Sequence, residues 1–233
     1  MNRTMIKTIA VIAMLFDHIA LFFLPVATPA YFFLRAFGRI TAILMTFFLV
    51  EGFIYTSSRS RYLLRLMLFT ALSQIPYSVA MFGTVSLVRW NVLATFLLAF
   101  LMLWAMEQRP FLWLFYVMGL FFLSYFCDWG IIVPLLALLF YLYRDARAKQ
   151  ILVGAAAFGV WIATLFTLSA EAGKTAAQFP WWACGMFLAL PFIAVYNGRK
   201  GSSGAFYKWG FYILYPMQFL LFWAILRLCP GLR

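Results

Sequence analysis

Apolar residues occur along this chain in long runs, separated by short groups of polar residues, glycines and prolines. Residues 40–50 and 131–143 are apolar at nearly every position, whereas a membrane β-strand alternates apolar and polar side chains. A helix that spans a bilayer needs about 20 apolar residues, so the pattern predicts transmembrane helices. We expect about nine, within a range of about eight to ten, at residues 6–24, 30–56, 62–82, 90–107, 110–127, 129–143, 149–168, 180–196 and 206–228.

Composition supports this interpretation. Hydrophobic residues make up 67% of the 233 residues, charged residues 10%, and the mean hydropathy is +0.97. A soluble domain is about half apolar and about a quarter charged, so a water-soluble globule is excluded. Nine spans use roughly 180 residues, which predicts one all-α polytopic membrane domain over residues 1–233. The fifth and sixth spans are short, and we expect them to be tilted or to form a re-entrant pair.

Basic residues set the predicted orientation. There are 18 Lys and Arg against 6 Asp and Glu, a formal net charge of +12. In a membrane protein this excess is a topology signal rather than a sign of nucleic-acid binding. It lies in alternate connections, which predicts a cytoplasmic amino terminus; among these residues are Arg3, Arg59, Arg61, Arg144, Arg147, Lys149, Arg199 and Lys200. Tryptophans near span ends are predicted to be interfacial anchors: Trp90, Trp104, Trp129, Trp181, Trp182 and Trp209.

Ionisable side chains occur inside the first three spans, where each costs several kcal/mol and marks a functional interior by default. They are Asp17, His18, Arg39, Glu51 and Arg65. The acids and arginines can also neutralise one another, so an ion network that only holds helices together is the alternative interpretation.

Asp17 shares a helix face with small residues at positions 10, 13 and 20, which predicts that it faces protein rather than lipid. Successive residues on a helix point about 100° apart, so Asp17 is poorly placed to hold the ring of His18. We expect Asp17 to meet Arg39 or another helix instead.

His18 is the only histidine, and its imidazole can take and return a proton near pH 7. It lies about 18 Å along the first span, close to the bilayer midplane. Lys7 is three helical turns earlier on the same face, roughly 16 Å away. That separation suits coenzyme A, with its phosphates near Lys7 and its reactive end near His18. The alternatives are a structural histidine and an interfacial lysine anchor.

Glu51 and Arg65 are expected within about 10 Å of the cytoplasmic face. They either pair, or Arg65 holds phosphate together with Arg61 and Arg59, because an arginine fork binds two oxygens at once. Arg39 lies in the outer half, where it can orient an acceptor.

Polar residues within the spans are candidates for lining the same cavity, although each alone is more often a helix–helix hydrogen bond. They are Gln74, Asn91 and Tyr215. The cysteines at positions 127, 184 and 229 are far apart and lack metal-ligand spacing, so no metal site is expected.

Ordered sequence blocks extend over nearly the whole chain: Lys7–Thr8–Ile9–Ala10, Asp17–His18, Gly38–Arg39, Glu51–Gly52–Phe53, Arg61–Tyr62–Leu63–Leu64–Arg65–Leu66, Ser73–Gln74–Ile75–Pro76–Tyr77, Asn91 with Thr95, Asp128–Trp129–Gly130, Tyr196–Asn197–Gly198–Arg199–Lys200–Gly201 and Phe211–Tyr212–Ile213–Leu214–Tyr215–Pro216. With these blocks the chain resembles the TraX family, membrane proteins named for the acetylation of F-type conjugative pilin.

The resemblance implies an acyl-CoA-dependent acetyltransferase, in which Lys7 helps hold the CoA and His18 is the base. Related transmembrane acyltransferases place a basic residue, ten intervening positions and a histidine in the first helix, a spacing that these two residues fit. The chain departs from the family pattern twice. Gln218 stands where the family's last motif has a histidine, and residues 41–44 lack a proline that the family usually carries.

The expected function is transfer of an acetyl group from cytoplasmic acetyl-CoA to an acceptor presented by the bacterial inner membrane. The acceptor would be the amino terminus of a pilin-like peptide, or a hydroxyl of a lipid or glycan. The predicted residues are His18, Asp17 and Arg39 for catalysis, Lys7, Arg61, Arg65 and Glu51 for the cofactor, and Gln74, Asn91, Asp128 and Tyr215 for the cavity. The alternatives are a transporter or flippase with a buried charge relay, and a non-catalytic membrane scaffold.

Overall fold

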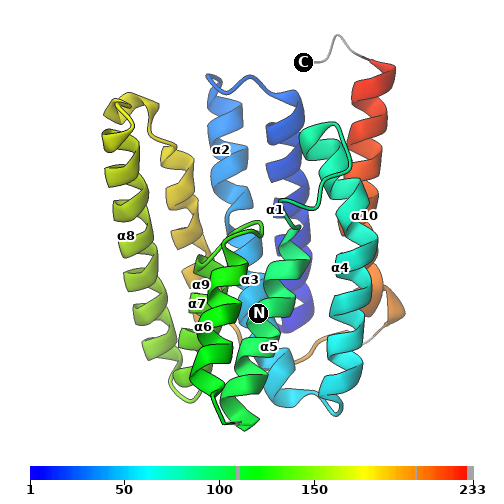
Figure 1. The fold of residues 1–233 in the computed structure, drawn as a ribbon, viewed down its shortest axis with the longest axis vertical. Coiled ribbons are helices and arrows are strands. Elements are labelled where there is room, and N and C mark those ends of the chain that lie inside the picture. The colour runs from blue at the N-terminus through cyan, green and yellow to red at the C-terminus, as the bar shows by residue number, and fades with distance from the viewer. Residues whose placement is uncertain (109–110, 203, 230–233) are drawn as a thin grey trace. The chain divides into compact units, whose positions relative to one another are not determined.

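The computed structural model describes residues 1–108, 111–202 and 204–229, which form helices joined by short connections and contain no β-strand (Figure 1). The elements are α1 (Arg3–Phe23), α2 (Pro29–Gly38), α3 (Ile40–Tyr55), α4 (Arg59–Phe82), α5 (Val92–Gln108), α6 (Trp113–Ser124), α7 (Ile132–Leu142), α8 (Arg147–Glu171), η1 (Ala176–Gln178), η2 (Trp181–Leu188), α9 (Ala189–Ala194) and α10 (Ala205–Leu228).

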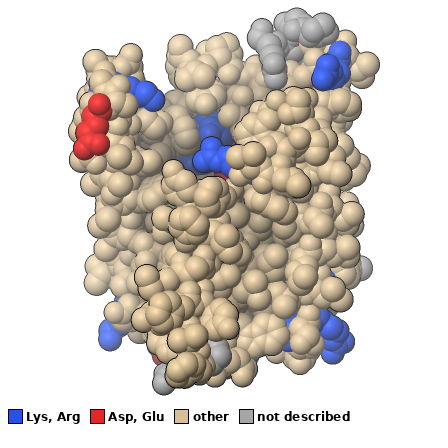
Figure 2. All heavy atoms as spheres, viewed as in Figure 1, with Lys and Arg blue, Asp and Glu red and all other residues tan. Residues whose placement is uncertain are grey.

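The predicted class, an all-α polytopic membrane protein, is confirmed. Five apolar helical segments of the described residues are long enough to cross a bilayer: Arg3–Phe23, Pro29–Tyr55, Arg59–Phe82, Arg147–Glu171 and Trp209–Leu228. Four shorter apolar helices, Val92–Gln108, Trp113–Ser124, Ile132–Leu142 and Trp181–Ala194, account for the remaining predicted spans. The predicted start of the fifth span, at 110, lies outside the described residues. On the face shown in Figure 2, the sides of the helices are largely uncharged, and most charged side chains lie near helix ends.

Helices begin where a polar side chain can accept hydrogen bonds from first-turn N–H groups, and α4 ends at a glycine. The side chains of Asn2, Thr28 and Ser58 accept hydrogen bonds from first-turn N–H groups of α1, α2 and α4. Gly83 ends α4 in the left-handed conformation, with φ of 76°, where a side chain would be strained.

The predicted second span is divided, because the helix breaks at Arg39 between α2 and α3. The backbone N–H of Arg39 is shared between the carbonyls of Arg35 and Ala36, both at 3.2 Å, which tightens the last turn of α2. The sequence has no proline at this break and only a single glycine, Gly38, so it did not predict that the helix ends here. The break coincides instead with the contact between α2 and Asp17 that is described below.

The described residues group into two compact units. The first contains residues 1–45 and 143–201, that is α1, α2, the start of α3, α8, η2 and α9. Within it α1 packs on α2, α2 packs on η2, and η2 and α9 pack on α8 (Figure 1). Ala10, Ala13, Asp17 and Ala20 are buried along one side of α1, as the small-residue face predicts.

The second unit contains residues 46–142 and α10, with α4 packed between α10 and α5, and with α6 and α7 on α5. Its α6 has 12 residues and α7 has 11, so each is about 16–18 Å long and shorter than the roughly 30 Å hydrocarbon core. The turn between them lies beside the segment that precedes α5: the N–H of Trp90 donates to Phe126 O at 2.9 Å, and that of Asp128 donates to Trp90 O at 2.7 Å. These two non-helical segments therefore satisfy each other's backbone, as the interior of a membrane protein requires.

Helix η2 approaches α2 so closely that one position admits only glycine. A Cβ built on Gly185 would lie 2.0 Å from the carbonyl oxygen of Ala36, a backbone atom that cannot move away alone. We therefore expect Gly185→Ala to lower the free energy of unfolding by about 3 kcal/mol. Gly159→Ala, in α8 with no atom within 4 Å of the added Cβ, is the control and should leave stability unchanged or raise it by up to about 1 kcal/mol. Thermal unfolding of the purified protein in detergent measures both, and equal melting temperatures for the two variants would contradict the close packing.

Candidate active site

The first unit contains a buried ion cluster built on Asp17. Oδ2 of this carboxylate accepts a hydrogen bond from Nη1 of Arg35 at 2.8 Å and a second from Nη2 of Arg39. Asp17 comes from the middle of α1, Arg35 from the last turn of α2, and Arg39 from the break after it. The predicted contact between Asp17 and Arg39 is confirmed.

Close packing of α1 on α2 aligns the three side chains. A Cβ on Gly38 would lie 2.2 Å from Cβ of Asp17, so only glycine lets α2 approach this near to the carboxylate. Arg35 and Arg39 are four residues apart and therefore lie on the same side of the chain as it leaves α2. One hydroxyl adds a second link between the segments, since Thr41 Oγ1 donates to Ala10 O at 2.8 Å.

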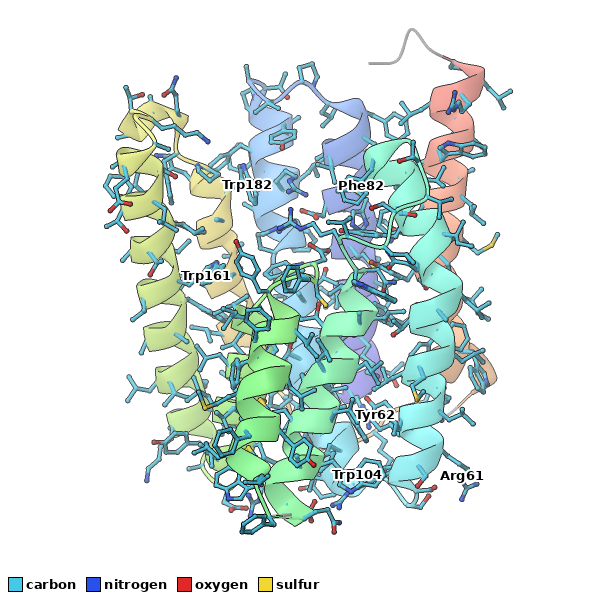
Figure 3. All side chains as sticks on the ribbon, in the orientation of Figure 1. Arg61, Tyr62, Phe82, Trp104, Trp161 and Trp182 are labelled. Carbon is cyan, nitrogen blue, oxygen red and sulfur yellow. The ribbon has the colours of Figure 1, made fainter. Side chains whose placement is uncertain are left out.

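Trp182 lies in η2 (Figure 3). Its indole ring covers both guanidinium groups. The guanidinium carbon of Arg35 lies 4.4 Å from the centroid of its indole ring, and that of Arg39 lies 5.0 Å from it. Such cation–π contacts are strongest where water is excluded. The sequence analysis treated Trp182 as an interfacial anchor and did not select Arg35, so the structure adds two residues to the predicted set. The signal available in the sequence was the four-residue spacing of the two arginines.

The cluster contains more positive than negative charge. Two guanidiniums share one carboxylate, which leaves a formal excess of one positive charge among side chains that are 7–14% exposed. The other acids in the described part of this unit are Asp145 and Glu171, and both are exposed near the ends of α8. Among the described residues, Asp17 is the acid that forms ion pairs with the two arginines.

His18 follows Asp17 on α1 and is half-buried. Because Asp17 bonds to the two arginines, its carboxylate serves them rather than the imidazole, as the 100° rotation between neighbours predicts. Lys7 lies on the same uninterrupted helix, three turns toward its start, and is also half-buried. The predicted separation of about 16 Å between their positions follows from the helical rise.

The start of α1 is joined to the segment that follows α9. The N–H of Arg3 donates to Arg199 O at 2.9 Å, and Thr4 Oγ1 donates to Lys200 O at 3.0 Å. A Cβ on Gly201 would lie 2.8 Å from side-chain atoms of Asn2 and Thr4, so this glycine permits the close approach. Arg199 and Lys200 are thus brought beside the end of α1 that contains Lys7. The sequence analysis used these two residues only for topology.

The residues predicted to bind the cofactor's phosphates from the third span lie in the second unit. Arg61 is exposed in the first turn of α4 (Figure 3). Arg59 forms an ion pair with Glu107 at 2.6 Å, so its guanidinium is already used and does not join Arg61 in binding phosphate. Arg65 makes no ion pair within the described residues; its guanidinium carbon lies 5.3 Å from the ring of Tyr62 and 6.0 Å from that of Trp209. Glu51 is half-buried on α3, and its pairing with Arg65 stays a prediction.

Gln74 and Asn91 lie in contact, and their hydrogen bonds hold the chain segment that precedes α5. Gln74 Nε2 donates to Ser86 O at 3.0 Å and to Arg89 O at 2.9 Å, and its Oε1 accepts from Asn91 Nδ2 at 2.9 Å. Asn91 Nδ2 also donates to the carbonyl of Thr70 at 2.9 Å. Both N–H bonds of each side-chain amide are thus used, so these side chains hold the loop at residues 83–91 and offer no spare donor.

The remaining cavity candidates, Tyr215 and Asp128, make hydrogen bonds to the first turn of α5, next to Asn91. The hydroxyl of Tyr215, in α10, accepts from the N–H of Val92 at 3.3 Å. Asp128 accepts at its carbonyl from Thr95 Oγ1, and its carboxylate accepts from the N–H of Trp129 at 3.0 Å. In the described residues no group of three or more His, Cys, Asp or Glu could hold a metal ion.

Gln218, which occupies the position of the family histidine, is 4% exposed on α10. Neither atom of its amide has a hydrogen-bond partner among the described residues.

The structure divides the predicted site residues into two groups, one in each compact unit. One contains Lys7, Asp17, His18 and Arg39 in the first unit, and the other contains Glu51, Arg61, Arg65, Gln74, Asn91, Asp128 and Tyr215 in the second.

Comparison with known proteins agrees with the resemblance found in the sequence. A family model described as "TraX protein" matches residues 2–226. The "Probable fimbrial assembly protein FimC, serogroup H1" of Dichelobacter nodosus is 33% identical over 228 residues, which are 93% of this chain and 92% of that protein. No solved structure matches the chain.

Asp17 is predicted to stabilise the first unit through charge. Asp17→Asn keeps the side-chain shape but removes the carboxylate charge that two buried guanidiniums share, so we expect the free energy of unfolding to fall by about 3–5 kcal/mol. Asp145→Asn removes a carboxylate that is 91% exposed and 3.8 Å from Arg144, and should change stability by less than about 0.5 kcal/mol. Thermal unfolding measures both; a loss of stability as small for Asp17→Asn as for the control would show that the ion cluster is not structural.

Proposed function

The chain belongs to the TraX family, and from that premise we propose that it is a membrane acetyltransferase. It would move an acetyl group from acetyl-CoA to an acceptor held in or at the bilayer. The amino terminus and the CoA-binding end would face the cytoplasm, and the membrane would be the bacterial inner membrane. The observation that supports this most is the pairing of Lys7 and His18 on one face of the continuous helix α1.

His18 would act as the general base. The attacking amine or hydroxyl loses its proton to the imidazole as its nitrogen or oxygen bonds to the thioester carbonyl carbon. The carbon–sulfur bond then breaks, and the CoA thiolate leaves and takes up a proton. No acyl-enzyme is required, because the acceptor attacks the thioester directly.

The cofactor's phosphates would lie at the start of α1. Lys7 is on the helix itself, while Arg3, Arg199 and Lys200 are brought to this end by the hydrogen bonds between α1 and residues 199–200. Lysine and arginine are the side chains that bind phosphate most strongly. The roughly 16 Å from Lys7 to His18 leaves room for a long cofactor to extend along the helix.

Arg39 would stabilise the oxyanion that develops on the thioester carbonyl, a role that Gln74 and Asn91 are not free to take. The amides of Gln74 and Asn91 are used by the loop at residues 83–91. Arg39 belongs to the same unit as His18 and has a permanent positive charge. One well-placed donor at a developing oxyanion is worth about 3 kcal/mol of barrier.

The acceptor would be a membrane-presented group rather than a soluble protein, since the described connections between helices are short. A pilin-like peptide is one candidate, and the name of the relative, a probable fimbrial assembly protein, supports it. The hydroxyl of a lipid or a lipid-linked glycan is the other.

Removal of the base should abolish transfer but not cofactor binding. In membranes incubated with radiolabelled acetyl-CoA, His18→Gln should lower labelling of the acceptor by at least about 100-fold, the usual contribution of a general base. The purified variant should still gain thermal stability with CoA, by about 2.7 kcal/mol at 100 times its dissociation constant.

Labelling by His18→Gln at the wild-type rate would refute the proposed base. Absence of any stabilisation of the wild-type protein by millimolar CoA would instead favour the transporter or scaffold interpretations. Transport across vesicles without CoA binding would identify the transporter.

Lys7 is predicted to contribute to CoA affinity. A hydrogen bond to a charged group is worth about 1.5–3 kcal/mol, so Lys7→Gln should raise the CoA dissociation constant by roughly tenfold or more. Lys149→Gln, an exposed lysine in the first turn of α8, is the control and should stay within about twofold. Calorimetric titration with CoA measures both constants, and equal constants for the two variants would exclude Lys7 from the cofactor site.

A further inference from the structure

Arg61 and Arg65 form a pair of positive charges in the second unit, and the proposed function gives them no role. They lie four residues apart on α4, so their side chains leave the same face of the helix, with roughly 6 Å between their Cβ atoms. Arg61 is exposed and points outward from α4 (Figure 3), and Arg65 is half-buried. Arg59, the third arginine at this end of the helix, is paired with Glu107. The charge that a ligand can reach here is therefore that of Arg61 and Arg65.

Two aromatic rings lie beside Arg65. Its guanidinium carbon is 5.3 Å from the centroid of the Tyr62 ring and 6.0 Å from that of Trp209, in α10. The five N–H donors of a guanidinium lie in the plane of the group, so contact with a ring leaves them available. The two rings therefore help to orient Arg65 without using the donors that would bind an oxyanion.

An open apolar stripe runs along α4 from the two arginines. Leu64, Leu68 and Leu72 are between 52% and 65% exposed, and their spacing of four residues places them on the face of α4 from which Arg61 and Arg65 extend. The buried residues of α4 lie on the other side of the helix. One face of this helix thus has positive charge near its start and exposed apolar surface beyond.

The depth of the two arginines suits a lipid headgroup. The 24 residues of α4 make it about 36 Å long, slightly more than the roughly 30 Å hydrocarbon core of a bilayer. Arg61 and Arg65 lie about 3 Å and about 9 Å from its start along the helix axis. Arginines near the end of a membrane helix extend their guanidiniums toward the headgroups. A phosphate at that level can therefore meet both guanidiniums while its acyl chains follow the leucines.

We propose that Arg61 and Arg65 bind the phosphate of an anionic membrane lipid, whose acyl chains lie along Leu64, Leu68 and Leu72. Each guanidinium can donate to both unesterified oxygens of a phosphodiester. Two positive charges favour an anionic headgroup over a zwitterionic one, whose cationic group they repel. A soluble phosphate compound such as CoA matches the charge but leaves the leucines uncovered. The site belongs to the second unit alone and does not rest on acetyl transfer.

The melting temperature of the purified protein in an uncharged maltoside detergent measures binding. Dihexanoyl-phosphatidylglycerol, a short-chain anionic lipid, should raise it in a saturable way. Two further probes separate the parts of this lipid: dihexanoyl-phosphatidylcholine has the chains without net charge, and glycerophosphoglycerol has the charge without chains. Each of these should bind at least roughly tenfold more weakly than the anionic lipid.

Arg61→Gln and Arg65→Gln each remove one guanidinium. Each should bind dihexanoyl-phosphatidylglycerol at least roughly tenfold more weakly than the wild type, because a charged hydrogen-bond donor is lost. Arg227→Gln is the matched control in the same unit. Arg227 is also exposed, with its guanidinium carbon 5.8 Å from the ring centroid of Trp223, but no second arginine lies one turn away. Its substitution should change the affinity by less than about twofold.

Equal affinities of the two test variants and the control would overturn the proposal. Equal binding of the anionic and the zwitterionic lipid would overturn it as well, and so would binding of glycerophosphoglycerol as tight as that of the anionic lipid. CoA is the last probe: if it displaces the lipid, and both test variants lose affinity for CoA by the same factor, the arginines bind the cofactor instead. If Arg65→Gln does not fold, Arg61→Gln, at an exposed position, decides alone.

Discussion

The burial of charge in an apolar medium is the constraint on which the first unit depends. Asp17 lies in the middle of an apolar helix and is tolerated because Arg35 and Arg39 reach it from α2 and from the break that follows. That contact requires glycine at position 38 and a shortened last turn in α2. The same contact directs the carboxylate of Asp17 toward the two arginines rather than toward His18.

The second unit meets a different constraint, the need to satisfy backbone groups where helices are interrupted. Its α6 and α7 are too short to cross a bilayer, and the chain before α5 is not helical. Gln74 donates to a backbone carbonyl of that segment, Asn91 donates from the segment to Thr70 O in α4, and Trp90 exchanges hydrogen bonds with residues 126 and 128. Hydrogen bonds from side chains and from a neighbouring segment therefore hold the chain where its helices are interrupted.

Much of this architecture could be predicted from the sequence, because length and hydropathy alone decide where a chain can cross a membrane. The span positions followed from these two properties, and the contact between Asp17 and Arg39 followed from the helix face on which Asp17 lies and from their opposite charges. The break at Arg39 and the role of Trp182 did not, since both depend on how α2 meets α1 and η2 in space. The local sequence pattern also could not show that both amide N–H bonds of Gln74 are used, because their acceptors, the carbonyls of Ser86 and Arg89, lie in a loop with no regular spacing. Arg65 was placed correctly on a helix, yet its aromatic neighbour Trp209 comes from a distant part of the chain.

We propose that α1 leads from a phosphate-binding end to a catalytic imidazole, and cryo-electron microscopy of the protein with a non-hydrolysable acetyl-CoA analogue tests this most directly. The expected result is density for the phosphates beside Lys7, with the thioester carbon near enough to the His18 ring for an acceptor's nitrogen or oxygen to lie between the two. An analogue bound elsewhere, or a His18 ring that faces lipid while the analogue is bound, would contradict it.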